Sequence, residues 1–158
     1  VVRKLISCSV VLGKGAKHHI GIGQKEMIDL TVRCRLGLYV LVELARTPDE
    51  QKSVVALRDI LSVSENHLSK VMQTLSRAKW ISGARGPGGG YRLLIKPAKV
   101  TMFDVFVLFE GHPDRQECSL KSGGECSLES TCRIKCVVRK IEDHAYAVMK
   151  KATLKSLI

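Results

Sequence analysis

The first regular hydrophobic pattern of the chain lies in residues 30–46. Apolar side chains recur there at the spacing of one helical face, at Leu30, Leu38, Leu41, Leu44 and Ala45. The pattern predicts a helix that ends before Pro48, because proline cannot continue a helix. The run from Leu36 to Ala45 is almost continuously apolar, which indicates that this helix is buried.

Two shorter helices are predicted next, over residues 54–61 and from Ser64 to about Lys79. Ser53 and Ser64 each stand directly before a helical pattern, where a serine hydroxyl can accept hydrogen bonds from the first turn of the helix. Only a tight turn at residues 62–63 separates the two helices. Their length and order predict a helix-turn-helix, in which the second helix is the recognition helix.

The second of these helices is amphipathic in a way that suits nucleic acid. Its apolar side chains share one face and are expected in the core: Leu68, Val71, Met72 and Leu75. Amide, hydroxyl, imidazole and cationic groups lie on or near the other face: Asn66, His67, Ser69, Lys70, Gln73 and Arg77. Such groups bind base edges and phosphates, although an ordinary solvated helix face is the alternative.

A glycine-rich hairpin follows the two helices. Two short β-like runs flank residues 86–90 in the segment WISGARGPGGGYRLL, and Arg85 and Arg92 stand on either side of the glycines. So much glycine lets the backbone approach another surface closely, and the order of elements predicts a winged helix. A nucleotide-binding loop is excluded because the following helix and the G-x-G-x-x-G spacing are missing.

The C-terminal half of the chain predicts two more helices and a terminal turn. Thr101 is suited to cap a helix over residues 102–110, and Thr153 to cap a last turn. From about Thr131 onward an apolar stripe recurs at helical spacing: Ile134, Val137, Val138, Ile141, Ala145, Val148 and Met149. Because little chain remains to cover this stripe, we expect the helix to pair with its copy in a dimer. The alternative is that it packs back on its own domain.

The expected fold class is therefore mainly α, with a small β-hairpin wing: a winged helix-turn-helix followed by a long dimerisation helix. The predicted organisation is a disordered extension or upstream sequence over residues 1–26, a DNA-binding domain over 27–111, a cysteine loop over 112–131, and the dimerisation helix with its terminal turn over 132–158. The 45% hydrophobic content of the 158 residues is enough for a core of this size.

The net charge indicates the class of binding partner, and the hydropathy pattern indicates the cellular location. The formal net charge of +11 favours a polyanion, nucleic acid before a membrane surface, with a merely solvated basic surface as the alternative. No apolar run reaches the roughly 18–20 residues of a membrane span, and the first residues lack a signal-peptide cleavage site. We therefore expect a cytoplasmic protein with reduced thiols. No catalytic constellation is visible, so an enzyme is not expected.

Four of the six cysteines lie close together near the C-terminus: Cys118, Cys126, Cys132 and Cys136. Their surroundings are polar and contain glycine, which suits metal ligation better than the packing of thiols in a core. The spacing C-x7-C-x5-C lacks the C-x2-C pairs of structural zinc sites and favours an iron–sulfur cluster. Zinc and a disulfide framework are the alternatives.

Together these segments resemble the Rrf2 family of bacterial winged-helix regulators, which includes IscR-type and NsrR-type iron–sulfur proteins. The resemblance runs from about Asp29 to the C-terminus. It rests on the wing motif in residues 85–92, on Leu30-Thr31 with Gly37-Leu38 in the first helix, and on the recognition-helix motif in residues 64–70. The segments around Cys126 and Cys132 and the end of the chain are most similar to the NsrR branch, the nitric-oxide-sensitive repressors.

The resemblance implies a homodimer that binds a palindromic operator in double-stranded DNA. Each subunit is expected to hold a [2Fe-2S] or [4Fe-4S] cluster through three cysteines: Cys118, Cys126 and Cys132. The family pattern places Asn66, His67, Ser69 and Lys70 in the major groove and Arg85 in the minor groove. We expect the intact cluster to hold the DNA-binding geometry, so that nitrosylation or loss of the cluster releases repression.

Two positions depart from the family pattern. Lys135 occupies the place of the histidine that IscR-type proteins carry three residues after the last cluster cysteine. Arg35 occupies the place of an acidic residue that can complete the cluster from the partner subunit in NsrR-type proteins. The remaining candidates for a fourth ligand are Cys34, Cys136 and a nearby carboxylate such as Asp29, and His112, just ahead of the cysteine loop, is a candidate spare ligand.

Other functions stay open from the sequence. The cluster could sense iron or cluster supply instead of nitric oxide. A zinc-stabilised DNA-binding protein without a sensing role is a second alternative, and an electron-transfer protein is a third.

Overall fold

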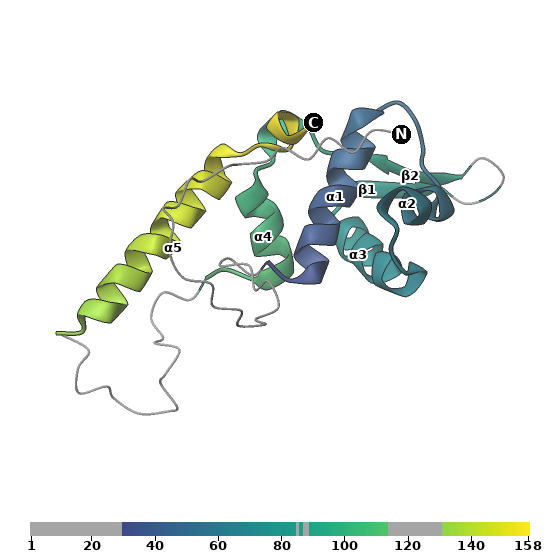
Figure 1. The fold of residues 1–158 in the computed structure, drawn as a ribbon. Coiled ribbons are helices and arrows are strands. Elements are labelled where there is room, and N and C mark those ends of the chain that lie inside the picture. The colour runs from purple at the N-terminus through teal and green to yellow at the C-terminus, as the bar shows by residue number, and fades with distance from the viewer. Residues whose placement is uncertain (1–29, 85, 87–88, 114–130) are drawn as a thin grey trace, which may run out of the picture.

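The computed structural model describes residues 30–84, 86, 89–113 and 131–158. Five helices, one hairpin and two 3-10 turns occupy these residues (Figure 1). In chain order they are α1 (Val32–Arg46), α2 (Val54–Leu61), α3 (Glu65–Arg77), β1 (Ile81–Ala84), β2 (Gly90–Leu93), η1 (Pro97–Lys99), α4 (Met102–Glu110), α5 (Arg133–Lys151) and η2 (Leu154–Leu157). The predicted fold class, mainly α with a small β wing, is confirmed.

Helices α1, α2 and α3 form the helix-turn-helix core. The largest fully buried side chains come mainly from these helices and from β1: Leu41, Leu44, Leu57, Leu68, Met72, Leu75 and Ile81. The Ser53 hydroxyl accepts from the amide of Ala56 at the start of α2, so the predicted cap is confirmed. Ser62 adopts a left-handed conformation at φ 52°, which ends α2 and turns the chain into α3.

The wing is a two-stranded antiparallel hairpin attached to the loop after α1. Ile81 pairs with Leu93 at its base and Ala84 with Gly90 near its tip. Lys52 extends the hairpin by an isolated bridge, in which its amide donates to the Tyr91 carbonyl at 3.0 Å and its carbonyl accepts from the Tyr91 amide at 2.8 Å. A Cβ atom at Gly90 would lie 2.7 Å from the Lys52 backbone, so this close approach requires glycine.

Helix α4 closes the core on the side of α1 away from α3. A Cβ atom at Gly37 would lie 2.3 Å from the ring of Phe109, so the absence of a side chain lets the two helices approach closely. Thr101 and Asp104 form a capping box at the start of α4, and Thr153 caps η2 through the amide of Ser156, as predicted. The amide of Leu154 donates to the Val100 carbonyl, which brings the C-terminal turn against η1 and α1.

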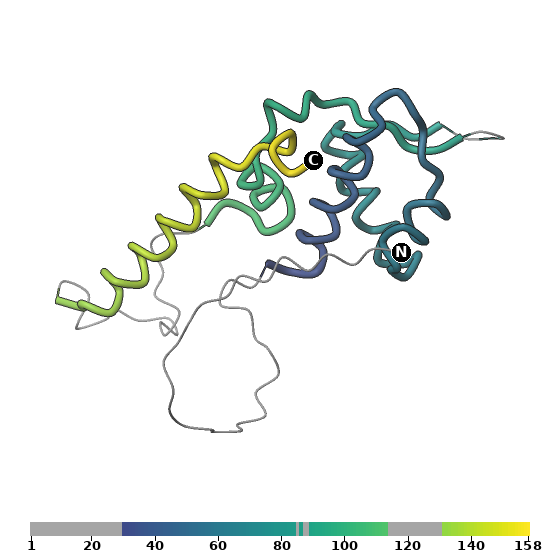
Figure 2. The backbone as a smooth tube through the Cα atoms, turned by 45° about the horizontal axis from the view of Figure 1, so that its top comes forward, coloured from purple at the N-terminus to yellow at the C-terminus, as the bar shows by residue number. Residues whose placement is uncertain are grey.

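Helix α5 is the longest element and projects from the rest of the molecule (Figures 1 and 2). Its C-terminal part packs on α4 through Met149 and through Tyr146, whose ring meets those of Phe103 and Phe106. The remaining apolar stripe is exposed, with Ile134 at 77% and Ile141 at 56% of their full accessibility. Helix α5 therefore packs back on its own domain, the alternative to dimerisation, only through its last turns.

No helix among the described ranges combines the length and the apolar character that crossing a bilayer demands.

Candidate DNA interface and cysteine site

The recognition helix α3 divides into two faces. All four predicted core residues are buried, with relative exposures of 0–2%: Leu68, Val71, Met72 and Leu75. At 3.6 residues per turn, the opposite face carries Asn66, Lys70, Gln73 and Arg77, and all four are exposed. Because the buried face fixes how α3 is rotated, these polar side chains are held toward the outside of the molecule.

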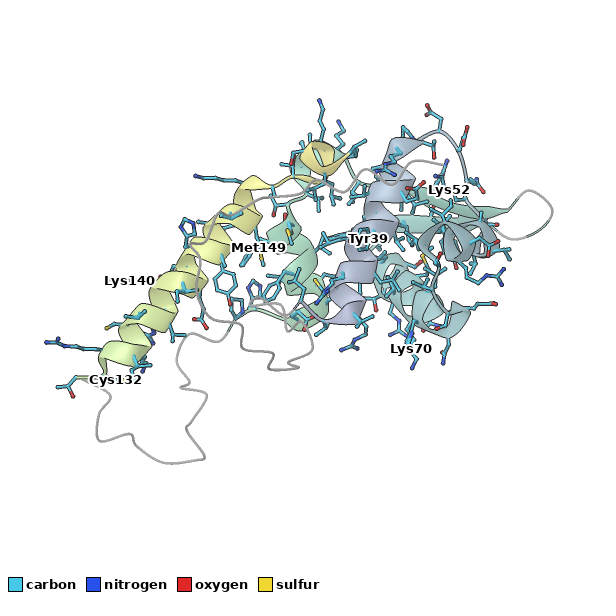
Figure 3. All side chains as sticks on the ribbon, viewed as in Figure 1. Tyr39, Lys52, Lys70, Cys132, Lys140 and Met149 are labelled. Atoms are coloured by element: carbon cyan, nitrogen blue, oxygen red, sulfur yellow. The ribbon has the colours of Figure 1, made fainter. Side chains whose placement is uncertain are left out.

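The start of α3 is fixed by a serine–histidine pair. The Ser64 hydroxyl accepts from the His67 amide and lies 3.0 Å from His67 Nδ1. The Nδ1 nitrogen of His67 is therefore engaged with the capping serine. Ser69 is half-buried and lies beside the exposed face of the helix. Figure 3 shows Lys70 on the outer side of α3, directed away from the body of the molecule. The structure thus brings Asn66, His67, Ser69 and Lys70 together at the N-terminal half of one helix.

The wing stands beside α3, and a partly buried ion pair supports its attachment. Lys52 Nζ lies 2.7 Å from a carboxylate oxygen of Glu43 on α1, and both side chains are only 14% exposed. The hydrogen bond from Lys52 lowers the pKa of Glu43, and the charges of Lys52 and Arg46 act in the same direction. The positive charge of Lys52 is therefore used within the protein to hold the bridge to β2.

This ion pair is a structural feature near the candidate DNA interface that the sequence did not reveal. Nine positions separate Glu43 from Lys52, and no helical or strand spacing connects them. On the wing itself, Arg92 Nε donates to the Ser82 hydroxyl at 3.2 Å, which fixes a second cation on the hairpin. Arg85, the expected minor-groove residue, lies outside the described residues.

Of the three expected cluster ligands, the described residues include Cys132 alone. Cys118 and Cys126 lie outside them. Cys132 is half-buried and forms the N-cap of α5, where its sulfur accepts from the Lys135 amide at 3.4 Å. A helix N-terminus favours negative charge, so this position suits a thiolate ligand. Cys132 therefore fits a metal centre, and Figure 3 places it at the tip of α5, remote from Lys70.

Among the candidates for a fourth ligand, Cys34 is unsuited to the role. Its side chain is fully buried and belongs to the same core cluster as Leu41 and Leu68. Burial, with a smaller effect of the Glu110 carboxylate, raises the pKa of the Cys34 thiol to about 11, which opposes the thiolate form. Cys136 is exposed on α5, four residues after Cys132. Asp29 lies outside the described residues.

A hydrogen bond connects the N-terminus of α1 to the C-terminus of α4, the helix that precedes the cysteine segment in the sequence. The Thr31 hydroxyl, which caps α1, donates to the Glu110 carboxylate. Next to it, Arg35 Nε donates to the Leu30 carbonyl at 2.9 Å. In the described part of the chain, no three His, Cys, Asp or Glu side chains converge as a metal-binding group.

Comparison with known proteins agrees with this geometry. Residues 30–158 match the Rrf2 family, described as iron-dependent transcriptional regulators. The HTH-type regulator named BadM from Rhodopseudomonas palustris is 36% identical over 77% of this chain and 76% of its own. The HTH-type transcriptional regulator NsrR of Geobacillus kaustophilus is 31% identical over 83% of this chain and 90% of its own.

Among solved structures, CymR, the global cysteine regulator of B. subtilis, superposes with a TM-score of 0.60 at 26% identity. The superposition covers 83% of this chain and 96% of CymR. The family match spans the recognition helix, the wing, the cysteine segment and α5 together. The chain therefore belongs to the Rrf2 family of DNA-binding transcription regulators.

Proposed function

We propose that this regulator is a homodimeric repressor whose operator binding is switched by an iron–sulfur cluster that senses nitric oxide. The observation that carries the proposal is the combination of two sites on one chain. The polar face of α3 stands beside a braced wing, and a cysteine that suits metal ligation begins α5. The similarity to NsrR supports nitric oxide as the signal, and the family's description as iron-dependent supports an iron centre.

For the DNA site, we assign α3 to the major groove. Asn66, His67, Ser69 and Lys70 supply the amide, imidazole, hydroxyl and ammonium groups that bind base edges and phosphates. Arg85 is assigned to the minor groove through its place in the wing motif. Because Lys52 is paired with Glu43, it is not counted among the phosphate contacts.

For the dimer, the exposed stripe of α5 is the proposed interface. Side chains that are 46–77% exposed form this stripe near the start of the helix: Ile134, Val137, Val138 and Ile141. Exposed apolar surface of this kind is buried most simply by the same surface of a second copy. A two-fold dimer would present two copies of α3 to a palindromic operator whose half-sites lie about 10 base pairs apart.

For the cluster, we assign Cys118, Cys126 and Cys132 as ligands. A cluster held by three thiolates supplies iron with an exchangeable position that is open to nitric oxide, oxygen or loss of iron. The Thr31–Glu110 hydrogen bond ties the end of α4, which leads into the cysteine segment, to the start of α1. This contact is the proposed route by which a change at the cysteines alters the placement of the DNA-binding domain.

A second candidate is a regulator that responds to iron or cluster supply. Arg35 favours it, because this residue stands where an acidic ligand is expected in the NsrR branch and cannot itself bind iron. A zinc-stabilised DNA-binding protein without a sensing role is the remaining alternative.

An anaerobic visible absorption spectrum, recorded before and after addition of nitric oxide, tests the proposal. We expect an iron–sulfur band that bleaches or shifts with a few equivalents, is lost in Cys132→Ala, and is kept in Cys34→Ala. A band that changes on iron chelation but not with nitric oxide would support the iron-status candidate. A colourless protein that binds zinc after anaerobic reconstitution with iron and sulfide would contradict any cluster-based function.

A further inference from the structure

The outer face of α3 extends beyond the residues assigned above. Gln73 follows Lys70 by three residues and Asn66 by seven, so all three lie along one straight stripe of the helix. Gln73 is exposed. The nearby residues Met72 and Leu75 lie on the opposite, core-facing side of the helix, where their exposures are only 2% and 0%. The packing of α3 therefore points Gln73 in the same direction as Asn66 and Lys70.

Hydrogen bonding separates the side chains of α3 that are engaged within the protein from those that are available. His67 Nδ1 contacts the Ser64 hydroxyl, and the Thr74 hydroxyl donates to the Lys70 carbonyl at 3.1 Å. Among the described residues, the side-chain carboxamide of Gln73 has no hydrogen-bond partner, and neither has that of Asn66. Gln73 thus presents both an N–H donor and a carbonyl acceptor to the surface.

From this placement we infer that Gln73 is a specificity-determining residue, which binds an adenine in each half-site of the operator. A glutamine amide pairs with adenine N6 and N7 in the major groove, whereas the lysine next to it acts as a point charge. Gln73 lies about one helical turn further along α3 than Lys70 and about two turns further than Asn66, so it contacts a base pair that those residues do not reach. This inference rests on the proposed placement of α3 in the major groove.

The test begins with operators selected from a random pool of duplex DNA by the wild-type dimer. Affinities for every single-base change in the selected site are then measured at fixed salt. We expect Gln73→Ala to lose its preference for adenine at one position per half-site, where the wild-type protein discriminates about 5- to 150-fold. Gln73→Glu should prefer cytosine at that position, because a carboxylate accepts from the cytosine amino group.

Thr74→Ala is the matched control, since Thr74 is the next residue on the helix but its hydroxyl bonds to the backbone. It should keep the wild-type preference at all positions. If the Gln73 variants also kept the wild-type preference everywhere, or weakened binding equally for all sequences, the inference would be overturned. If the wild-type protein selected no sequence from the pool, the proposed operator binding would fail together with it.

Discussion

Two lysines in the DNA-binding domain carry the same charge in different environments. The side chain of Lys52 is only 14% exposed, and its ammonium group lies 2.7 Å from the Glu43 carboxylate. A charge-assisted hydrogen bond thus replaces part of the water that would otherwise surround both groups. Lys70 is exposed on α3 and makes no such contact within the described part of the chain. The environment therefore assigns Lys52 to the stability of the wing, whereas the charge of Lys70 is exposed at the surface, as the proposed phosphate contact requires.

The pair between Glu43 and Lys52 makes stability dependent on pH. The pKa of Glu43 is lowered from its ordinary value of 4.5, so the pair stabilises the fold fully above that pH. The stabilisation is lost as the pH falls through the lower pKa of the folded state. We expect Glu43→Gln to reduce the free energy of unfolding at pH 7 by about 1–3 kcal/mol, and by less at pH 3.

Urea unfolding of the wild-type protein and the variant at the two pH values measures this difference. Glu50→Gln is the control, because Glu50 is exposed after the end of α1 and its substitution should change stability by less than about 0.5 kcal/mol. A Glu43→Gln variant whose deficit grew as the pH fell would contradict the assignment.

Lys70 should contribute to DNA binding through charge alone. We expect Lys70→Ala to weaken operator binding for all sequences alike and to reduce the slope of log affinity against log salt by about 0.9. Fluorescence anisotropy with labelled duplex over a salt series gives this slope. Lys140→Ala on α5 removes the same charge on another part of the molecule and should leave the slope unchanged (Figure 3). Equal salt slopes for the wild type and Lys70→Ala would contradict a phosphate contact by Lys70.

At the scale of elements, α3 and α5 are both amphipathic but differ in what covers them. The apolar face of α3 is buried by α1, α2 and β1, so its polar face is free for a partner. Helix α5 is covered by α4 at its C-terminal end, and its apolar stripe is exposed toward its start. The first arrangement presents a polar surface suited to DNA, and the second presents an apolar surface suited to a second copy.

The last residue of the exposed stripe, Ile141, gives a test of the dimer. We expect Ile141→Glu to convert the dimer to a monomer, because pairing would bury an unpaired charge within the interface. The fold of the monomer should persist, since Ile141 is 56% exposed in the single chain. Sedimentation velocity gives the mass, and circular dichroism checks the fold. The control Lys140→Ala should stay dimeric. A dimeric Ile141→Glu variant would contradict the interface.

At the scale of the whole molecule, signals local in sequence predicted the fold well. The bounds of α2 and α4 and the caps at Ser53, Ser64 and Thr101 match because capping and periodicity involve neighbouring residues. The burial of Cys34 was not predicted, because this residue was considered as a fourth cluster ligand, although it precedes Leu41 by seven residues on the buried face of α1.

Contacts between distant residues could not be predicted in the same way. The bridge from Lys52 to Tyr91 and the hydrogen bond from Thr31 to Glu110 join segments that only the assembled fold brings together. The first braces the wing, and the second joins the start of α1 to the chain that leads toward the cysteines. Both contribute to the function proposed here through the placement of elements, which no local sequence pattern encodes.

The most direct test of the central claim compares operator affinity with and without the cluster. Cluster-loaded and apo protein, at matched dimer concentration and fixed salt, are titrated anaerobically against the same selected duplex. The account predicts that the cluster-loaded dimer binds about 5- to 150-fold more tightly and that nitric oxide abolishes the difference. Equal affinities of the two forms would contradict a cluster-based switch.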